Sequence, residues 1–282
     1  MARILLLGGH GKIALQMTKI LASRNHTVTS IIRNPDHAEE IRALAPDSSK
    51  RDLVKPVVAS IEEADDEAAK KLMENIDWVI WSAGTIAHFA GKLESWVDPP
   101  LRFTGAGGKG GKERTKAVDE VAAKRFIAAA MAAPSPTKFL MVSANCSRRK
   151  PASYWSEKDK EAFEGAWKAI PDYCEAKTEA DEFLFNESRK FVQGGGKKWQ
   201  DICLRPGTLS DDPAKGKVDL GRAKAYGKVP RDDVAAVAVE LLEQSDDESK
   251  NAGGLWIDLI AGDEPIGEAV GRVLKEKITS RD

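Results

Sequence analysis

The sequence predicts an α/β fold in which a doubly wound parallel sheet carries helices on both faces. Two observations support this prediction. Short apolar or β-branched runs alternate with longer amphipathic segments, and the first apolar run is followed directly by a glycine-rich turn. The 282 residues contain no long linker that would separate two cores. We therefore expect residues 1–282 to form a single domain with a small substrate-side lobe toward the C-terminus.

The expected elements follow from these alternating patterns. Apolar and β-branched runs predict strands at 4–7, 26–32, 57–59, 77–84, 138–143, 199–204 and 255–260. Helical spacing predicts helices at 15–24, 62–75, 115–133, 172–189, 232–243 and 265–277. The alternation is interrupted in segments 148–171 and 210–231, the first of which is charged and aromatic. We expect both segments on the substrate side of the sheet.

Residues 85–112 form the least regular part of the chain. Segment 85–104 has weak periodicity and contains Pro99-Pro100, and the stretch that follows it is glycine-rich. Glu113 stands where a P-loop needs Ser or Thr to bind magnesium, and no strand precedes the glycines, so a P-loop is not expected. We expect a long insertion and glycine-rich loop, with disorder or closure over a bound cofactor as the two alternatives.

Charge and hydropathy argue against several classes of partner. The chain has 43 Lys and Arg residues against 44 Asp and Glu residues, a formal net charge of −1. This balance provides no net positive electrostatic field that would attract nucleic acid or an acidic membrane surface. No run has the length of a signal peptide or a membrane span. We expect a cytoplasmic protein with a small-molecule substrate, no nucleic-acid partner and no membrane partner, as a monomer or homodimer.

Cysteine and histidine usage argues against a metal centre. The cysteines are three in number, widely spaced and without a C-x-x-C pair, which favours a reducing compartment over a disulfide framework. The histidines also lack metal-ligand spacing, so we expect no metal. The residues concerned are Cys146, Cys174, Cys203, His10, His26, His37 and His88.

The segment 8–14 (GGHGKIA) indicates a phosphate-binding turn between a strand and a helix. Gly8 permits the tight turn, Gly11 lets the backbone approach a pyrophosphate, and Ala14 lets the helix lie close to the strand. The spacing Gly-x-x-Gly-x-x-Ala is a variant of the dinucleotide fingerprint. The candidate pyrophosphate residues are Gly8, Gly9, His10, Gly11, Lys12 and Ile13.

The end of the second predicted strand indicates which dinucleotide is bound. NAD-specific folds carry an Asp or Glu there for the ribose hydroxyls, whereas a nearby arginine suits a 2′-phosphate. This chain has Arg33-Asn34 and no acid at that place. We expect a preference for NADP(H), with NAD(H) possible; the alternative is an ordinary exposed arginine in a turn.

Tyr173 and Lys177 stand four residues apart on a predicted helix and share one face of it. A nearby ammonium favours the phenolate form, so we expect Lys177 to lower the pKa of Tyr173 toward the range of a general acid or base. Ser143, at the end of the fifth predicted strand, is the candidate group that polarises a carbonyl. Chance spacing of the Tyr-x-x-x-Lys pair is the alternative.

With the glycine turn, the Tyr-x-x-x-Lys pair and the Arg-Pro-Gly at 205–207 in this order, the sequence resembles the short-chain dehydrogenase/reductase superfamily. Within it, the sequence is most similar to atypical, extended-type NAD(P)H-binding members, NmrA-like and biliverdin- or flavin-reductase-like. Segments with specific likeness are 32–35, 81–84, 114–119, 140–143, 204–209 and 229–235.

The resemblance implies a Rossmann fold that binds NAD(P)(H) through a distributed set of residues. The implied cofactor contacts are Gly8, Gly11, Ile13, Arg33, Ser82, Ala83, Gly84, Tyr173 and Lys177, with Pro206, Gly207, Thr208 and Leu209 near the nicotinamide. We add the neighbouring candidates Gly9, His10, Lys12, Asn34, Ser60, Val142 and Ser143.

Three functions agree with these residues. The first is an NADP(H)-dependent oxidoreductase of a small carbonyl or hydroxyl substrate, with Tyr173, Lys177 and Ser143 as its catalytic residues. The second is an NADP(H)-sensing regulatory protein without turnover, as the resemblance to NmrA-like members implies. The third is an epimerase acting on a nucleotide sugar.

Overall fold

The computed structural model describes residues 1–84 and 111–282. Its centre is a nine-stranded sheet with the order β11-β8-β10-β6-β5-β4-β1-β2-β3. Strands β3, β2, β1, β4, β5, β6 and β10 are parallel, and β8 is antiparallel to β10. The sheet strands are Arg3–Leu7 (β1), Thr27–Ile32 (β2), Val54–Val58 (β3), Trp78–Trp81 (β4), Lys138–Val142 (β5), Gln200–Pro206 (β6), Lys217–Gly221 (β8), Leu255–Ala261 (β10) and Glu264–Pro265 (β11). The predicted doubly wound Rossmann fold is confirmed.

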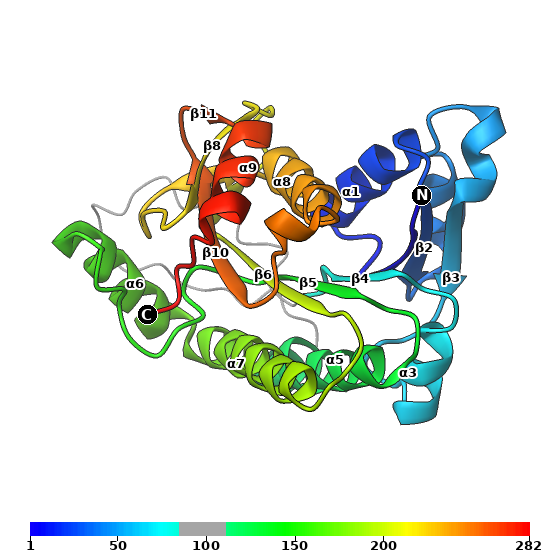
Figure 1. The fold of residues 1–282 in the computed structure, drawn as a ribbon, viewed down its shortest axis with the longest axis horizontal. Coiled ribbons are helices and arrows are strands. Elements are labelled where there is room, and N and C mark those ends of the chain that lie inside the picture. Colours follow the sequence, from blue (N-terminus) through cyan, green and yellow to red (C-terminus); the bar gives the residue numbers. More distant parts are fainter. Residues whose placement is uncertain (85–110) are drawn as a thin grey trace.

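Helices cover both faces of this sheet, as Figure 1 shows. Helices α1, α8 and α9 lie on one face, and α3, α5 and α7 lie on the other. Because the strand order reverses between β1 and β4, the carboxyl ends of these two strands flank the crevice where such sheets bind ligands. The helices are Lys12–Ser23 (α1), Ala38–Arg42 (α2), Asp66–Leu72 (α3), Gly111–Thr115 (α4), Ala123–Ala132 (α5), Glu157–Ala169 (α6), Pro171–Gln193 (α7), Arg231–Gln244 (α8) and Ile266–Glu276 (α9).

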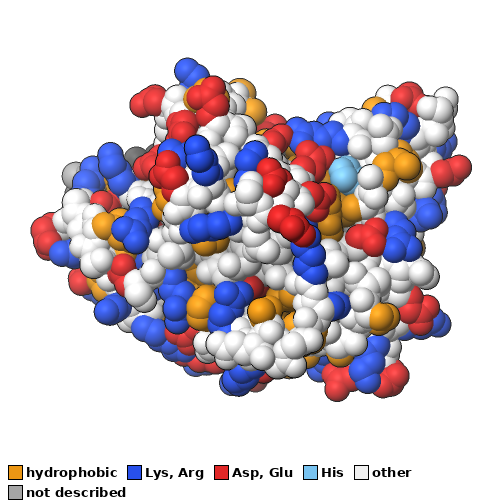
Figure 2. All heavy atoms as spheres, viewed as in Figure 1, with side chains coloured by type: hydrophobic (Ala, Val, Ile, Leu, Met, Phe, Trp, Pro, Cys, Tyr) orange, Lys and Arg blue, Asp and Glu red, His pale blue; other side chains and the backbone are white. Residues whose placement is uncertain are grey.

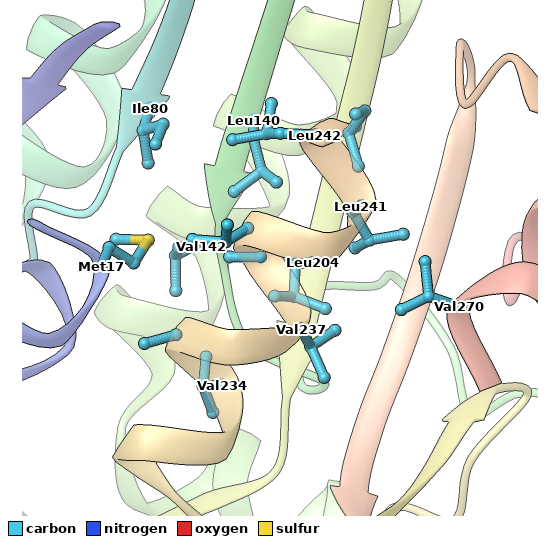
Figure 3. Packing of buried hydrophobic residues seen from close by; sticks show 14 of the residues in the cluster. Met17, Ile80, Leu140, Val142, Leu204, Val234, Val237, Leu241, Leu242 and Val270 are labelled. Atoms are coloured by element: carbon cyan, nitrogen blue, oxygen red, sulfur yellow. The ribbon is translucent and has the colours of Figure 1, made fainter. Parts of the chain in front are cut away.

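Two apolar layers hold the sheet and the helices together. On one face, the aliphatic side chains of α8 pack between α1, α9 and the strands β5 and β6 (Figure 3). Val237 and Leu241 of α8 and Leu204 of β6 are completely buried there. Burying each such side chain contributes about 1.5–3 kcal/mol, so this layer fixes the strand ends that carry the site.

Several predicted element boundaries differ from the structure. The third strand is β3 at Val54–Val58 rather than 57–59, because pairing with β2 sets its register. Pro56 is tolerated there since β3 is an edge strand. The helix predicted at 62–75 is the shorter α3, and the one predicted at 115–133 is α4 and α5 joined by a π-helical stretch, Lys116–Ala122. Helix α2 and strands β7 (Thr208–Ser210), β8, β9 (Lys228–Pro230) and β11 were not predicted.

The segments expected on the substrate side lie against each other. Helix α6 begins with a capping box at Ser156 and Asp159. Trp155 packs with Phe163, and its indole Nε1–H donates to the carbonyl of Ala223 at 2.9 Å. Segments 148–171 and 210–231 are therefore joined in one aromatic cluster. The insertion predicted at 85–104 and the glycines through Gly110 lie outside the described residues.

The surface has mixed charge, as the net charge of −1 predicts. Acidic and basic side chains are interspersed over the face in Figure 2. Within residues 1–84 and 111–282, no helix is long and apolar enough to cross a membrane.

Candidate functional site

The glycine turn packs directly onto the end of β4. Gly8 has φ of +86°, a conformation that favours glycine, and a Cβ there would lie 2.7 Å from the Cα of Ala83. Gly11 differs, because its φ is −68° and a Cβ would lie 3.2 Å from the Gly8 carbonyl oxygen. Gly8 is therefore required by the backbone itself, whereas Gly11 has an ordinary φ and is constrained only by its close contact with the Gly8 carbonyl oxygen.

The N-terminus of α1 is open to an anion. Gly11 is its N-cap, and its first turn contains no acidic residue; among residues 1–84 and 111–282, no side chain caps the helix. The first N–H groups of a helix lack intrahelical acceptors and carry a partial positive charge. This turn therefore suits a pyrophosphate, and the cavity beside it is the space that a bound dinucleotide would need.

A cleft of about 440 Å³ extends from this turn across the ends of β2, β3 and β4. Eight predicted cofactor residues line it: Gly8, His10, Gly11, Arg33, Asn34, Ser82, Ala83 and Gly84. Its other lining residues are Ile31, Ile32, His37, Ala59, Ile61, Glu62, Arg114 and Val118. The volume falls in the range of small-molecule sites.

Other predicted cofactor residues lie elsewhere. Ile13 and Val142 are buried in the apolar layer beneath α8. Gly9 packs against β2, where a Cβ would lie 2.0 Å from the Ser30 hydroxyl oxygen. The Ser60 hydroxyl accepts a hydrogen bond from the Glu63 backbone N–H at 3.3 Å.

The loop predicted near the nicotinamide follows β6. Residues 206–209 cover the end of β6 and the start of β7, and the structure places them outside the lining of the described cleft. Asp211, just beyond them, pairs with Lys12 of α1 at 2.5 Å and with Arg231 of α8 at 2.6 Å. These ion pairs tie the loop to the helix that begins at the glycine turn.

The rim of the cleft carries most of its charged side chains. One carboxylate oxygen of Glu62 lies 3.2 Å from Arg33 and 3.1 Å from Arg114. At the glycine turn, His10 stacks on His37 with ring centroids 3.5 Å apart and contacts Glu40 at 2.8 Å. Arg33 and Arg114, to which the sequence assigned no role, therefore line the same part of the cleft and share Glu62.

Lys177 and Tyr173 lie on α7, but the lysine is paired with a different residue. Lys177 Nζ lies 2.9 Å from Asp119 Oδ1 and 5.7 Å from the centre of the Tyr173 ring. Burial raises the pKa of Tyr173 well above its usual value, and the Asp119 carboxylate raises it further. The structure does not support the expectation that Lys177 lowers the Tyr173 pKa, because Asp119 pairs with the ammonium and its negative charge raises the pKa of the phenol.

Ser143 belongs to a second buried cluster. Its hydroxyl donates to Asp181 at 2.8 Å and lies 3.1 Å from the Ser147 hydroxyl. Burial raises the pKa of Asp181, which Arg205 counteracts from 3.8 Å. The Ser143 proton is therefore directed to the Asp181 carboxylate in this structure.

The structure adds polar residues that sequence reasoning did not single out. Arg114 and Asp119 both fall in segment 114–119, which was noted for its likeness to known relatives, but no role was assigned to either residue. The π-helical stretch at Lys116–Ala122 carries Asp119 inward, where it is fully buried. An acid on the apolar face of an alanine-rich predicted helix, in line with Ala122, Ala123 and Phe126, is the sequence signal that could have indicated it. Among the residues that the structure describes, no group of His, Cys, Asp and Glu could hold a metal ion.

A parallel sheet with a glycine turn at its topological switch point defines a dinucleotide-binding protein of the Rossmann class. The chain belongs to the NAD(P)H-binding family, whose model matches residues 8–245. This membership confirms the NAD(P)H-binding class that the resemblance implied.

Known proteins resemble the chain over nearly its whole length. The UPF0659 protein of Schizosaccharomyces pombe is 30% identical over 98% of this chain and 96% of its own. The uncharacterized sugar epimerase YhfK of Bacillus subtilis is 25% identical over 96% of this chain and 100% of its own. The crystal structure of the oxidoreductase ylbE from Lactococcus lactis shares the fold with a TM-score of 0.66, at 22% identity and 97% coverage of both chains.

Proposed function

We propose that this protein is an NADP(H)-dependent oxidoreductase that reduces the carbonyl group of a small organic substrate. The observation that supports it most is the cleft itself, in which the uncapped start of α1 and two arginines mark the two ends of one ligand site. A pyrophosphate would contact Gly8 and Gly11, and a 2′-phosphate would contact Arg33.

When bound, the reduced nicotinamide supplies a hydride to the carbonyl carbon. The Tyr173 phenol would give its proton to the carbonyl oxygen. Because burial raises the pKa of Tyr173, this side chain holds its proton at neutral pH and suits a proton donor better than a base. A protonated Tyr173 phenol is the form that the reduction step needs.

Lys177 would hold the nicotinamide ribose. Within residues 1–84 and 111–282, its ammonium contacts Asp119 at 2.9 Å and the Ala83 carbonyl at 3.4 Å. An ammonium has three donors, so a third N–H suits a ribose hydroxyl. Ala83 follows β4 and lines the cleft, so Lys177 connects α7 to the cofactor side of the sheet.

A second candidate is an NADP(H)-sensing protein without turnover. The contacts of Ser143 favour it, because a hydroxyl that donates to Asp181 does not donate to a substrate carbonyl. The same cleft would then bind the dinucleotide, and occupancy rather than chemistry would be the output.

Absorbance of the reduced nicotinamide separates these two candidates. The purified protein is incubated with NADPH and a panel of small aldehydes and ketones. Substrate-dependent loss of absorbance is expected from an oxidoreductase. Tight NADPH binding without turnover across the panel would contradict the enzyme and favour the sensor.

A further inference from the structure

One carboxylate oxygen in the cleft wall is shared by two guanidinium groups. Glu62 Oε1 lies 3.2 Å from Arg33 Nη1, 3.1 Å from Arg114 Nη2 and 3.2 Å from Arg114 Nε. The three residues come from different places in the chain, after β2, after β3 and from α4, and all line the same cleft. The fold therefore gathers two positive charges and one negative charge at the adenosine end.

This arrangement leaves both guanidinium groups accessible to a ligand. The side chain of Arg33 is 59% exposed and that of Arg114 is 38% exposed, whereas the side chain of Glu62 is 26% exposed. A guanidinium has five donors in a planar fork, more than a single carboxylate oxygen can accept. A phosphate monoester offers three acceptor oxygens and a charge of about −1.5 to −2. It would therefore accept more hydrogen bonds from the two guanidinium groups than the single Glu62 oxygen does.

We infer that Arg33 and Arg114 together form the subsite for the adenosine 2′-phosphate, with Glu62 as the internal counter-ion that the phosphate displaces. The inference rests on the proposed dinucleotide function. It makes Arg114 a second residue that determines the preference for NADP(H). In the free protein Glu62 holds the two guanidinium groups at the position that the phosphate takes.

Glu62 should weaken the binding of a cofactor with a 2′-phosphate and support the binding of one with a 2′-hydroxyl. Its carboxylate competes with a 2′-phosphate for the same arginines, and like charges repel at this distance. A ribose 2′-hydroxyl can instead donate a hydrogen bond to that carboxylate. Replacing Glu62 by glutamine should therefore strengthen the binding of a 2′-phosphate, while its amide oxygen can still accept a hydrogen bond from a 2′-hydroxyl.

The test compares two nucleotides that differ only in this phosphate. Adenosine 2′,5′-bisphosphate and adenosine 5′-monophosphate are titrated calorimetrically into the full-length parent and into R114A, R33A and E62Q. Arg125 provides the matched control R125A, since it is a helical arginine beyond the cleft, 3.5 Å from Asp66. Far-UV circular dichroism and thermal unfolding establish that each variant is folded.

We expect R114A and R33A each to weaken the bisphosphate about ten- to hundredfold, the effect of losing a charge-assisted hydrogen bond, and to leave the monophosphate unchanged. R125A should alter neither nucleotide, and E62Q should bind the bisphosphate more tightly than the parent. Equal losses for both nucleotides in R114A, or weaker bisphosphate binding in E62Q, would overturn the phosphate subsite while leaving the dinucleotide site in place. A parent that binds neither nucleotide, NADPH nor NADH would overturn the proposed function as well.

Discussion

The Lys177 ammonium forms a buried ion pair with Asp119, with Nζ 2.9 Å from Oδ1. The two side chains are 2% and 0% exposed, so the pair is shielded from water. A carboxylate at this distance compensates the positive charge that would otherwise stabilise a Tyr173 phenolate. The pair therefore holds the Lys177 ammonium, which also donates to the carbonyl of Ala83 at 3.4 Å, and Tyr173 keeps its proton.

Breaking this pair should destabilise the protein. Asp119→Asn leaves a buried ammonium without its counter-charge, which costs about 3–5 kcal/mol in other buried pairs. The free energy of unfolding in urea, measured for the parent and the variant, gives the loss directly. Glu67→Gln removes the partner of Lys70 in an exposed pair and should change stability by less than about 1 kcal/mol. Equal effects from the two variants would contradict a buried pair at Asp119.

Tyr173→Phe should lower kcat for carbonyl reduction by about 10²- to 10⁴-fold, the effect of a positioned general acid. Affinity for NADPH should stay close to that of the parent, because the phenol is assigned to the substrate. Steady-state kinetics and a binding titration measure the two effects separately. Undiminished turnover in the Tyr173 variant would remove Tyr173 from the mechanism.

The raised pKa of Tyr173 predicts the pH dependence of each direction. The phenol is protonated below its pKa, and burial moves that pKa upward. Reduction should therefore not decline between about pH 7 and about pH 9 through loss of this proton, while alcohol oxidation, which needs the phenolate, should rise with pH. Profiles of kcat in both directions test this. A reduction rate that falls with an apparent pKa near neutrality would show that Lys177 does lower the Tyr173 pKa.

The two glycines of the turn should respond differently to a branched side chain. Gly11→Val is compatible with the observed φ of −68°, but its methyl groups would enter the cleft, so we expect a folded protein without NADPH binding. Gly8→Val requires φ of +86° and places a Cβ 2.7 Å from the Ala83 backbone, so we expect loss of stability. Thermal unfolding and NADPH titration distinguish these results. Normal NADPH affinity in a folded Gly11 variant would exclude the turn as a pyrophosphate site.

Local patterns in the sequence predicted the sheet and the glycine turn. Buried parallel strands such as β1 and β5 are continuous apolar runs, and the turn that follows β1 is read from adjacent residues. Strand β8 was missed because pairing with β10 defines it, and its own sequence, KVDLG, is short and mixed. Pairing across the sheet is not visible in the residues of one segment.

The candidate site was predictable only where neighbours in the chain form it. Arg33 follows directly from the end of β2, whereas its ion-pair partner Glu62 comes from beyond β3. Asp119 meets Lys177 only because a π-helical stretch and α7 pack together. The protonation of Tyr173 depends on that packing, so the four-residue spacing with Lys177 predicted the wrong direction for its pKa.

Titration of the parent protein and the Arg33→Ala variant with NADPH and with NADH tests whether the cleft binds NADP(H) through Arg33. We expect tighter binding of NADPH by the parent, and a loss of about ten- to hundredfold for NADPH alone in the variant. Equal affinity of the parent for both cofactors, or equal losses in the variant, would contradict it.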